Sequence, residues 1–158
     1  MENKIAIGIE KVAVETFEVM CYLFPLAESE ITAEKKRIPA EVVTSAVRFD
    51  GAVRGGMILR TTPELLQAIA VNMLGVEEVS EEQKKGALCE IVNIMCGNVT
   101  PLFTSGGEIC YIHPPWVAEQ GNRPEDLFQG MNQESLVLYM DEGPVEILVY
   151  YTLLEEMS

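Results

Sequence analysis

Positive charge is scarce in this sequence. Eleven lysines and arginines stand against 25 aspartates and glutamates, so the formal net charge at pH 7 is −14. Affinity for nucleic acid comes largely from lysine and arginine side chains that neutralise phosphates, and we therefore expect no nucleic-acid partner. The same negative charge disfavours binding to anionic membranes and favours solubility, while it leaves protein partners open.

Cysteine and histidine are also few, which limits the metal and redox chemistry that the chain can support. The only histidine, His113, has no second ligand near it in the sequence and stands beside Pro114 and Pro115. We predict a turn or surface residue there rather than a general base or a metal ligand. No CxxC pair is present, so we predict reduced core thiols rather than a disulfide framework or a zinc site. The four cysteines are Cys21, Cys89, Cys96 and Cys110.

Long apolar runs and linker segments are absent as well. No apolar run approaches the roughly 18 residues of a membrane span. The N-terminal stretch MENKIAIGIEKV lacks the basic flank, the long apolar core and the cleavage site of a signal peptide. With 158 residues, of which 48% are hydrophobic, and no low-complexity break, the sequence predicts one globular domain over residues 1–158. We expect this domain in the cytoplasm, without a membrane partner.

Two helices are predicted in the first half of the chain from apolar periodicity and end signals. The first covers residues 6–24, and Pro25 marks its stop. The second lies within residues 61–75, where two threonines offer caps, Pro63 stands in the first turn and Gly75 provides the C-terminal stop.

Strands are predicted between and after these helices. Two β-rich runs flank Asp50-Gly51, a dipeptide suited to a tight hairpin turn in which both residues take positive φ. A short strand is predicted within residues 107–117, followed by a polar loop over 118–134. The chain closes with two strands over 135–154, turned about a Gly-Pro dipeptide.

An internal echo relates the two halves. A shift of 75 places lays VETFEVMC over CEIVNIMC, so that Glu15 meets Glu90 while Glu18 meets Asn93. In each half the helix is followed by a strand pair turned near Asp and Gly. We predict an α+β fold made of two pseudo-duplicated halves, about 5–75 and 80–158, with long helices packed on a mixed, mainly antiparallel sheet.

A third predicted helix carries the most informative polar residues. It opens at Ser80, which forms a capping box with Gln83, and Pro101 ends it. Glu90 and Asn93 project from neighbouring turns of one face of this helix, about 5 to 6 Å apart at Cβ. The rest of the circumference is almost entirely apolar, and we expect Gly97 and Thr100 to continue the polar stripe.

The stripe has a plain interpretation and a functional one. Every amphipathic helix has a solvated side, and isolated Glu-x-x-Asn pairs are common. However, asparagine and glycine are weaker helix residues than the lysine, glutamate or glutamine that solubility alone would require, which favours a function. The carboxamide of Asn93 donates and accepts hydrogen bonds at once and can hold a water molecule, while Glu90 can pair with a lysine across an interface. Because neither suits nucleophilic attack or unaided acid–base hydrolysis, the pair is predicted to complete another protein's active site.

The stretch GALCEIVNIMCGNVTP resembles the motif helix of the CheC/CheX/FliY phosphatases of bacterial chemotaxis. The family pattern Glu-x-x-Asn-x-x-x-Gly-Asn is matched by Glu90, Asn93, Gly97 and Asn98. The family's proline, about 22 residues after the asparagine, is matched by Pro115. A single copy of the motif is similar to the CheX branch, and the order of elements follows the family across the whole chain.

The resemblance implies a phosphatase that acts on the aspartyl phosphate of a CheY-type receiver domain. Asn93 would orient the attacking water and Glu90 would pair with a receiver lysine. Three further residues would contact the partner: Gly97, Asn98 and Pro115. The chain would need no cofactor of its own, because the receiver brings the Mg²⁺, and a homodimer is implied by the same resemblance.

Two departures and two rival functions accompany this prediction. Gly86 stands where some relatives have Asp or Ser, and Glu18 replaces the asparagine in the first half, so that Glu15 and Glu18 form a silent copy.

A non-catalytic docking module of the flagellar-switch type would share the fold and only bind its partner. A Glu90–Asn93 pair that is buried in the structure would favour this module. A small-molecule sensor would need an apolar pocket with convergent polar groups, and the sequence indicates none.

Overall fold

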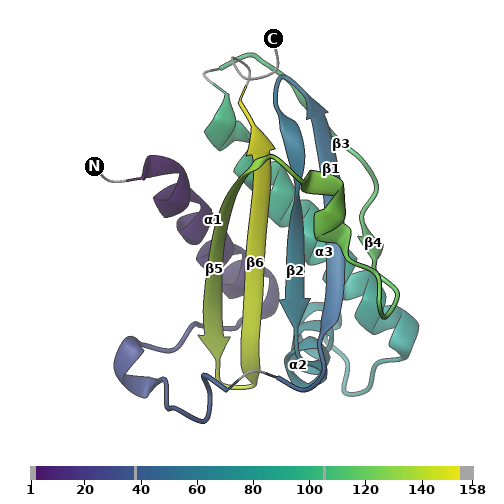
Figure 1. Ribbon diagram of the computed structural model, residues 1–158. Helices are drawn as coiled ribbons and strands as arrows, with labels where there is room; N and C mark the ends of the chain where they lie inside the picture. Colours follow the sequence, from purple (N-terminus) through teal and green to yellow (C-terminus); the bar gives the residue numbers. More distant parts are fainter. Residues whose placement is uncertain (1–2, 38, 105, 154–158) are drawn as a thin grey trace.

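An antiparallel sheet with three helices on one of its faces forms the framework of the protein (Figure 1). The computed structural model describes residues 3–37, 39–104 and 106–153. The sheet order is β3–β1–β2–β6–β5, with β4 also paired to β1, and each of these pairings is antiparallel. The strands are β1 (Val43–Gly51), β2 (Arg54–Thr61), β3 (Cys110–Ile112), β4 (Trp116–Val117), β5 (Asn132–Met140) and β6 (Gly143–Thr152).

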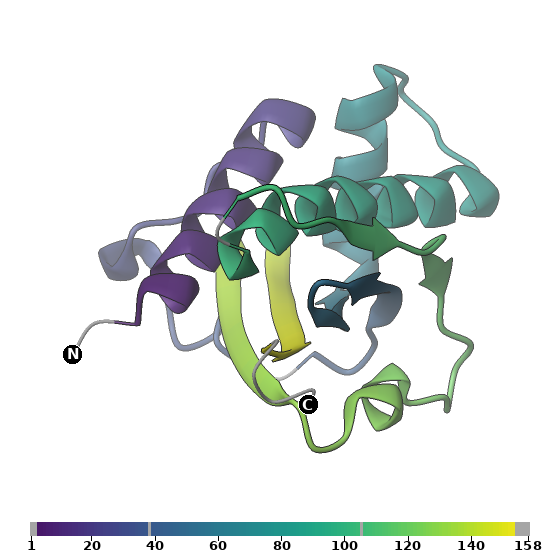
Figure 2. The ribbon, with the colours of Figure 1, turned by 90° about the horizontal axis from the view of Figure 1, so that it is seen from above.

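The helices confirm the predicted α+β class. They are α1 (Lys4–Cys21), α2 (Pro63–Leu74) and α3 (Glu81–Val99), joined by the short 3-10 helices η1 (Glu28–Glu30), η2 (Thr100–Phe103) and η3 (Pro124–Phe128). Seen from above, the helices lie on one side of the strands and η3 on the other (Figure 2). The protein therefore has a helical layer, a sheet, and a partial cover over the outer face of the sheet.

Local signals set the ends of α2 and α3 as predicted. The hydroxyl of Thr62 accepts a hydrogen bond from the amide of Leu65, and Gly75 ends α2 in the left-handed region with φ 67°. Ser80 and Gln83 form the expected reciprocal capping box at the start of α3. After Val99 the chain tightens into η2, which contains Pro101.

α1 ends earlier than residue 24, because contacts from elsewhere in the fold stop it. Tyr22 adopts a left-handed conformation with φ 54°, and its amide and that of Leu23 bond back to carbonyls of the last turn. The side chain of Asn72 in α2 donates to the carbonyl of Cys21 at 2.7 Å. This long-range cap replaces the stop that Pro25 was expected to provide.

The two expected hairpin turns are displaced from the predicted dipeptides. Asp50 lies within β1 opposite Tyr111 of β3, and of the Asp50-Gly51 pair only Gly51 has positive φ, at 107°. The loop extends through Val53, which is buried and so draws the turn residues towards the core. In the second hairpin Asp141 and Glu142 form the turn, and the Gly-Pro dipeptide begins β6. Both tight-turn predictions were therefore wrong in register.

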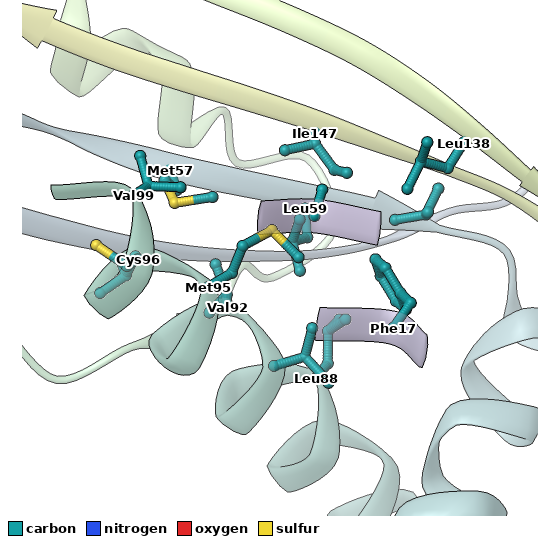
Figure 3. Packing of buried hydrophobic residues seen from close by; sticks show 14 of the residues in the cluster. Phe17, Met57, Leu59, Leu88, Val92, Met95, Cys96, Val99, Leu138 and Ile147 are labelled. Carbon is teal, nitrogen blue, oxygen red and sulfur yellow. The ribbon is translucent and has the colours of Figure 1, made fainter. Parts of the chain in front are cut away.

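α3 closes the core between the sheet and the other two helices. Leu88, Val92 and Met95 point from α3 towards Leu59 and Ile147 on the sheet (Figure 3). By length and composition alone, the segment Glu81–Phe103 is also apolar enough to cross a membrane. Because its buried side chains belong to the main hydrophobic cluster, it packs as a core helix.

A second, smaller cluster covers part of the outer face. Phe128 of η3 stacks on Tyr150 of β6 with ring centroids 5.0 Å apart. Arg60 of β2 binds Glu125 of η3 and, at 3.1 Å, Glu146 of β6. η3 lies inside the stretch that the sequence predicted only as a polar loop, and its apolar and ionic contacts attach that stretch to the sheet.

Two of the predicted core thiols are fully buried. Cys21 and Cys96 have no exposed surface, and burial raises the pKa of each to about 12. Cys89 and Cys110 are half-buried, and burial also raises the pKa of Cys89. At neutral pH the thiols of Cys21 and Cys96 are protonated and act as small apolar groups.

Candidate functional site

The side of α3 that faces away from the core carries the predicted polar pair. Glu90 is exposed and Asn93 is half-buried, and Gly97 and Asn98 are exposed one turn further along. Thr100 does not continue this stripe, contrary to expectation: it is buried, because the chain has by then turned into η2. The stripe is therefore shorter than the sequence predicted and is centred on Glu90 and Asn93.

Neither member of the pair is used to hold the fold together. Among the described residues, no hydrogen bond or ion pair engages the side chain of Glu90 or Asn93. Asn98 differs, since its amide nitrogen donates to the carbonyl of Ile94 at 3.0 Å. A half-buried carboxamide that is uncommitted in its own chain keeps its donor and acceptor available for a ligand or a water molecule.

Two glycines leave the backbone of α3 uncovered on either side of the pair. A Cβ atom at Gly86 would meet nothing within 4 Å, and one at Gly97 would meet only Ile112 Cδ1, at 3.9 Å. Each glycine costs the helix about 1 kcal/mol relative to alanine, and the fold of this chain requires neither of them. Their effect is to make the helix narrow where Glu90 and Asn93 project.

The segment that contains Pro115 runs beside this helix. Figure 2 shows β3 and β4 lying along α3, and Ile112 of β3 contacts the position of Gly97. Pro115 is half-buried in the segment between the two strands, both of which pair with β1. The structure thus brings the motif helix and the proline segment to one edge of the sheet, although they are separate in the sequence.

His113 has a partner that sequence reasoning did not find. Its Nε2 lies 2.7 Å from Oδ2 of Asp50 in β1, and both side chains are partly exposed. His113 lies between β3 and β4 with its side chain partly exposed, so the surface position allowed by the prediction is confirmed. The contact with Asp50 was missed because the two residues are 63 positions apart, and no local pattern links them.

The chemistry of the surface favours water positioning over self-contained hydrolysis. No group of three histidine, cysteine, aspartate or glutamate side chains suited to hold a metal ion occurs in the described part of the chain. The stripe around Asn93 offers carboxamides and one carboxylate, and α3 contains no serine or histidine. Cys89, one turn before Asn93, is half-buried, and burial raises the pKa of its thiol. Such a set can orient water and bind a cation on a partner.

A family model described as Chemotaxis phosphatase CheX matches residues 43–138, more than half of the chain. No curated protein matches the sequence.

Among solved structures, a complex of CheX with CheY, BeF3 and Mg²⁺ from Borrelia burgdorferi is similar over 95% of this chain and 99% of the other, with a TM-score of 0.73 and 17% identity. CheX from Vibrio vulnificus gives a TM-score of 0.70 at 16% identity, over 95% of this chain and 97% of the other. CheX from Desulfovibrio desulfuricans gives 0.70 at 15% identity, over 95% and 100%. At these identities the likeness establishes the fold.

Proposed function

The chain belongs to the chemotaxis phosphatase CheX family, and on that premise we propose that it hydrolyses the aspartyl phosphate of a CheY-type receiver domain. The observation that carries this proposal is the free, outward-facing pair of Glu90 and Asn93 on α3. A helix that served only the core would gain no stability from a half-buried carboxamide that makes no hydrogen bond among the described residues. A helix that enters the active site of another protein gains a group ready to act there.

Asn93 is proposed to orient the attacking water. Phosphoryl transfer depends mainly on positioning and on stabilisation of charge, and little covalent chemistry falls to the protein. The Asn93 carboxamide oxygen would accept a hydrogen bond from the water, and its amide would keep the water aligned with the phosphorus atom. The proton released by the water passes to a phosphate oxygen or to solvent, so this chain needs no strong base.

The neighbouring residues are proposed to bind the receiver. Glu90, which is exposed and has no ion pair within the described part of the chain, would pair with a lysine of the partner. Gly97 lets the partner approach the helix backbone, and Asn98 and Pro115 border that approach. Asn98 would contribute its oxygen, because its nitrogen is bound to the carbonyl of Ile94.

The metal ion, the partner and the assembly of the complex belong to the same proposal. The Mg²⁺ would be held by the receiver. The B. burgdorferi relative is a CheX–CheY complex with BeF3 and Mg²⁺, and this supports a receiver as the partner. A homodimer, and a place in the cytoplasm beside receiver domains, complete the proposal.

The halves 5–75 and 80–158 are proposed to descend from one duplicated unit. α1 and α3 pack against each other on the same face of the sheet, as equivalent helices would. Glu15 is exposed and Glu18 is half-buried on α1. A carboxylate at position 18 would repel an aspartyl phosphate, so the first copy would be silent.

The direct test is to incubate the purified protein with a panel of receivers phosphorylated by acetyl phosphate, in the presence of Mg²⁺. Decay of the aspartyl phosphate would be followed by fluorescence in a stopped-flow instrument. We expect at least one receiver to lose its phosphoryl group faster than it does alone. If receivers bind without any acceleration, the protein is a docking module rather than a phosphatase.

Glu90→Ala is expected to weaken binding of the phosphorylated receiver and to slow its dephosphorylation together. Loss of one charge-assisted contact costs about 1.5–3 kcal/mol, or roughly 10- to 150-fold in affinity. Titration of the receiver in the presence of beryllofluoride and Mg²⁺ measures the affinity. Glu10→Ala removes an exposed glutamate from α1 and should change neither quantity; unchanged affinity in Glu90→Ala would contradict the assigned role.

A further inference from the structure

The contact between His113 and Asp50 fixes the segment that follows β3. His113 is held to β1 twice, by its ring at Asp50 and by its amide, which donates to the carbonyl of Arg48 at 2.8 Å. On the far side of the two prolines, the amide of Ala118 donates to the carbonyl of Thr44 at 2.9 Å. The segment at residues 114–115, which continues along β1 between β3 and β4, is thereby anchored to β1 at both ends.

The position of this segment along α3 follows from one contact and one shared cavity. Ile112 lies against Gly97, and Lys85, about 18 Å back along the helix, lines the same surface cavity as Val117 and Ala118. The extended segment from Ile112 to Val117 covers about 17 Å. The helix and the segment therefore lie side by side along this edge of the sheet (Figure 2).

Asn93 falls opposite the His113–Pro114 part of the segment in this alignment. It precedes Gly97 by about 6 Å along the helix, which corresponds to about two residues past Ile112 on the strand, at His113 and Pro114. Asn93 stands one turn before Gly97 on the same face of α3 and is half-buried, whereas Glu90 is exposed. This alignment makes the Pro114–Pro115 segment the side wall next to the Asn93 carboxamide.

Prolines suit a wall in this position. Pro114 and Pro115 have no backbone N–H, so this stretch cannot donate a hydrogen bond that would capture the Asn93 oxygen. Their fixed φ angles also keep the wall stiff. A stiff neighbour without donors restricts the rotamers of Asn93 while leaving its polar atoms free, which is consistent with the uncommitted carboxamide.

We infer that His113 and Asp50 are positioning residues for the phosphatase reaction, and that their contact holds the Pro114–Pro115 wall against Asn93. This inference rests on the proposed function, since Asn93 is the residue that it positions. The carboxylate of Asp50 accepts and Nε2 of His113 donates, so the link needs a side chain with a donor at that atom. Without the link the backbone bonds to Arg48 and Thr44 remain, but the wall is held less firmly, and Asn93 samples conformations that misplace the water.

The test compares His113→Ala with His113→Gln and Asp50→Ala. The glutamine amide nitrogen stands as many bonds from Cα as the histidine Nε2 and keeps the donor. The dephosphorylation rate of a receiver phosphorylated by acetyl phosphate is measured at saturating phosphatase. The affinity for the receiver is measured in the presence of beryllofluoride and Mg²⁺. The side-chain amide signals of Asn93, identified by their loss in Asn93→Ala, are followed by NMR. Asp141→Ala, which breaks the exposed contact with Lys35 at the β5–β6 turn, is the matched control.

We expect His113→Ala and Asp50→Ala to lower the maximal rate about tenfold, with affinity within about twofold of the parent, because a small misplacement slows chemistry more than binding. Both should shift or broaden the Asn93 amide signals, whereas His113→Gln and Asp141→Ala should resemble the parent in rate and spectrum.

Unchanged Asn93 signals in His113→Ala overturn the inference, whatever the rate. An unchanged rate does so too, as does a rate loss explained by weaker binding. If the parent protein accelerates no receiver, the proposed function fails, and the NMR comparison alone still decides whether His113 positions Asn93. Thermal unfolding of each variant shows that the comparison is made on folded protein.

Discussion

Asn93→Ala is expected to lower the rate of receiver dephosphorylation about a hundredfold while binding stays measurable. The variant removes the only carboxamide of the α3 stripe that makes no hydrogen bond within the described chain. A water that is no longer held in line with the phosphorus atom loses much of the advantage of proximity, and misplacement by about 1 Å can cost 10²-fold. Glu90 remains in place and continues to hold the receiver, so the loss falls on the chemical step.

Stopped-flow decay of the phosphorylated receiver, at several phosphatase concentrations, separates the maximal rate from affinity. Gln133→Ala is the matched control, because it deletes an exposed carboxamide from β5, which lies at the other end of the sheet order from β3. Its rate and affinity should equal those of the parent. An Asn93→Ala protein as fast as the parent would show that Asn93 does not orient the attacking water.

Gly55→Ala is expected to be the most destabilising single methyl addition in the sheet, at about 3 kcal/mol. A Cβ atom at this position of β2 would overlap the carbonyl of Tyr150 in β6 and lie 2.9 Å from the ring of Phe49. The carbonyl belongs to the backbone and cannot rotate away as a side chain would. Relief requires the pairing of β2 with β6 to open, so the loss includes ladder hydrogen bonds.

Urea unfolding, followed by circular dichroism, measures this change. Gly86→Ala provides the contrast, because its new methyl group enters open space on a helix and should raise the free energy of unfolding by up to about 1 kcal/mol. The same glycine-to-alanine substitution is thus expected to lower the free energy of unfolding at position 55 and to raise it at position 86. A Gly55→Ala protein as stable as the parent would show that β2 and β6 can move apart at little cost.

Features governed by contacts between near neighbours in the chain were predictable from the sequence. The Thr62 cap and Gly75 stop of α2, and the Ser80–Gln83 box of α3, all involve residues within a few positions of a helix end. The end of α1 was not predictable in this way. It depends on Asn72 of α2, 51 positions beyond Cys21, whose amide binds the carbonyl of that residue.

The candidate site shows the same division. The placement of Glu90 beside Asn93 follows from helical periodicity and was predicted, as was the outward direction of the pair. The contact of Asp50 with His113 was not predicted, because Asp50 was assigned to a turn while the structure pairs it with β3. A strand that joins from elsewhere in the chain changed the role of an aspartate whose local pattern indicated a hairpin.

The position of α3 at the centre of the core has a consequence for regulation. Its inner residues pack on the sheet and its flanks contact α1 and α2, so the helix that presents Asn93 cannot melt or slide without opening the interior. Backbone amides in such a helix exchange with solvent only through large-scale opening. The site on α3 is therefore always in its active conformation. Its activity can be controlled by a protein that covers it or by a change in the receiver, but not by a rearrangement of α3.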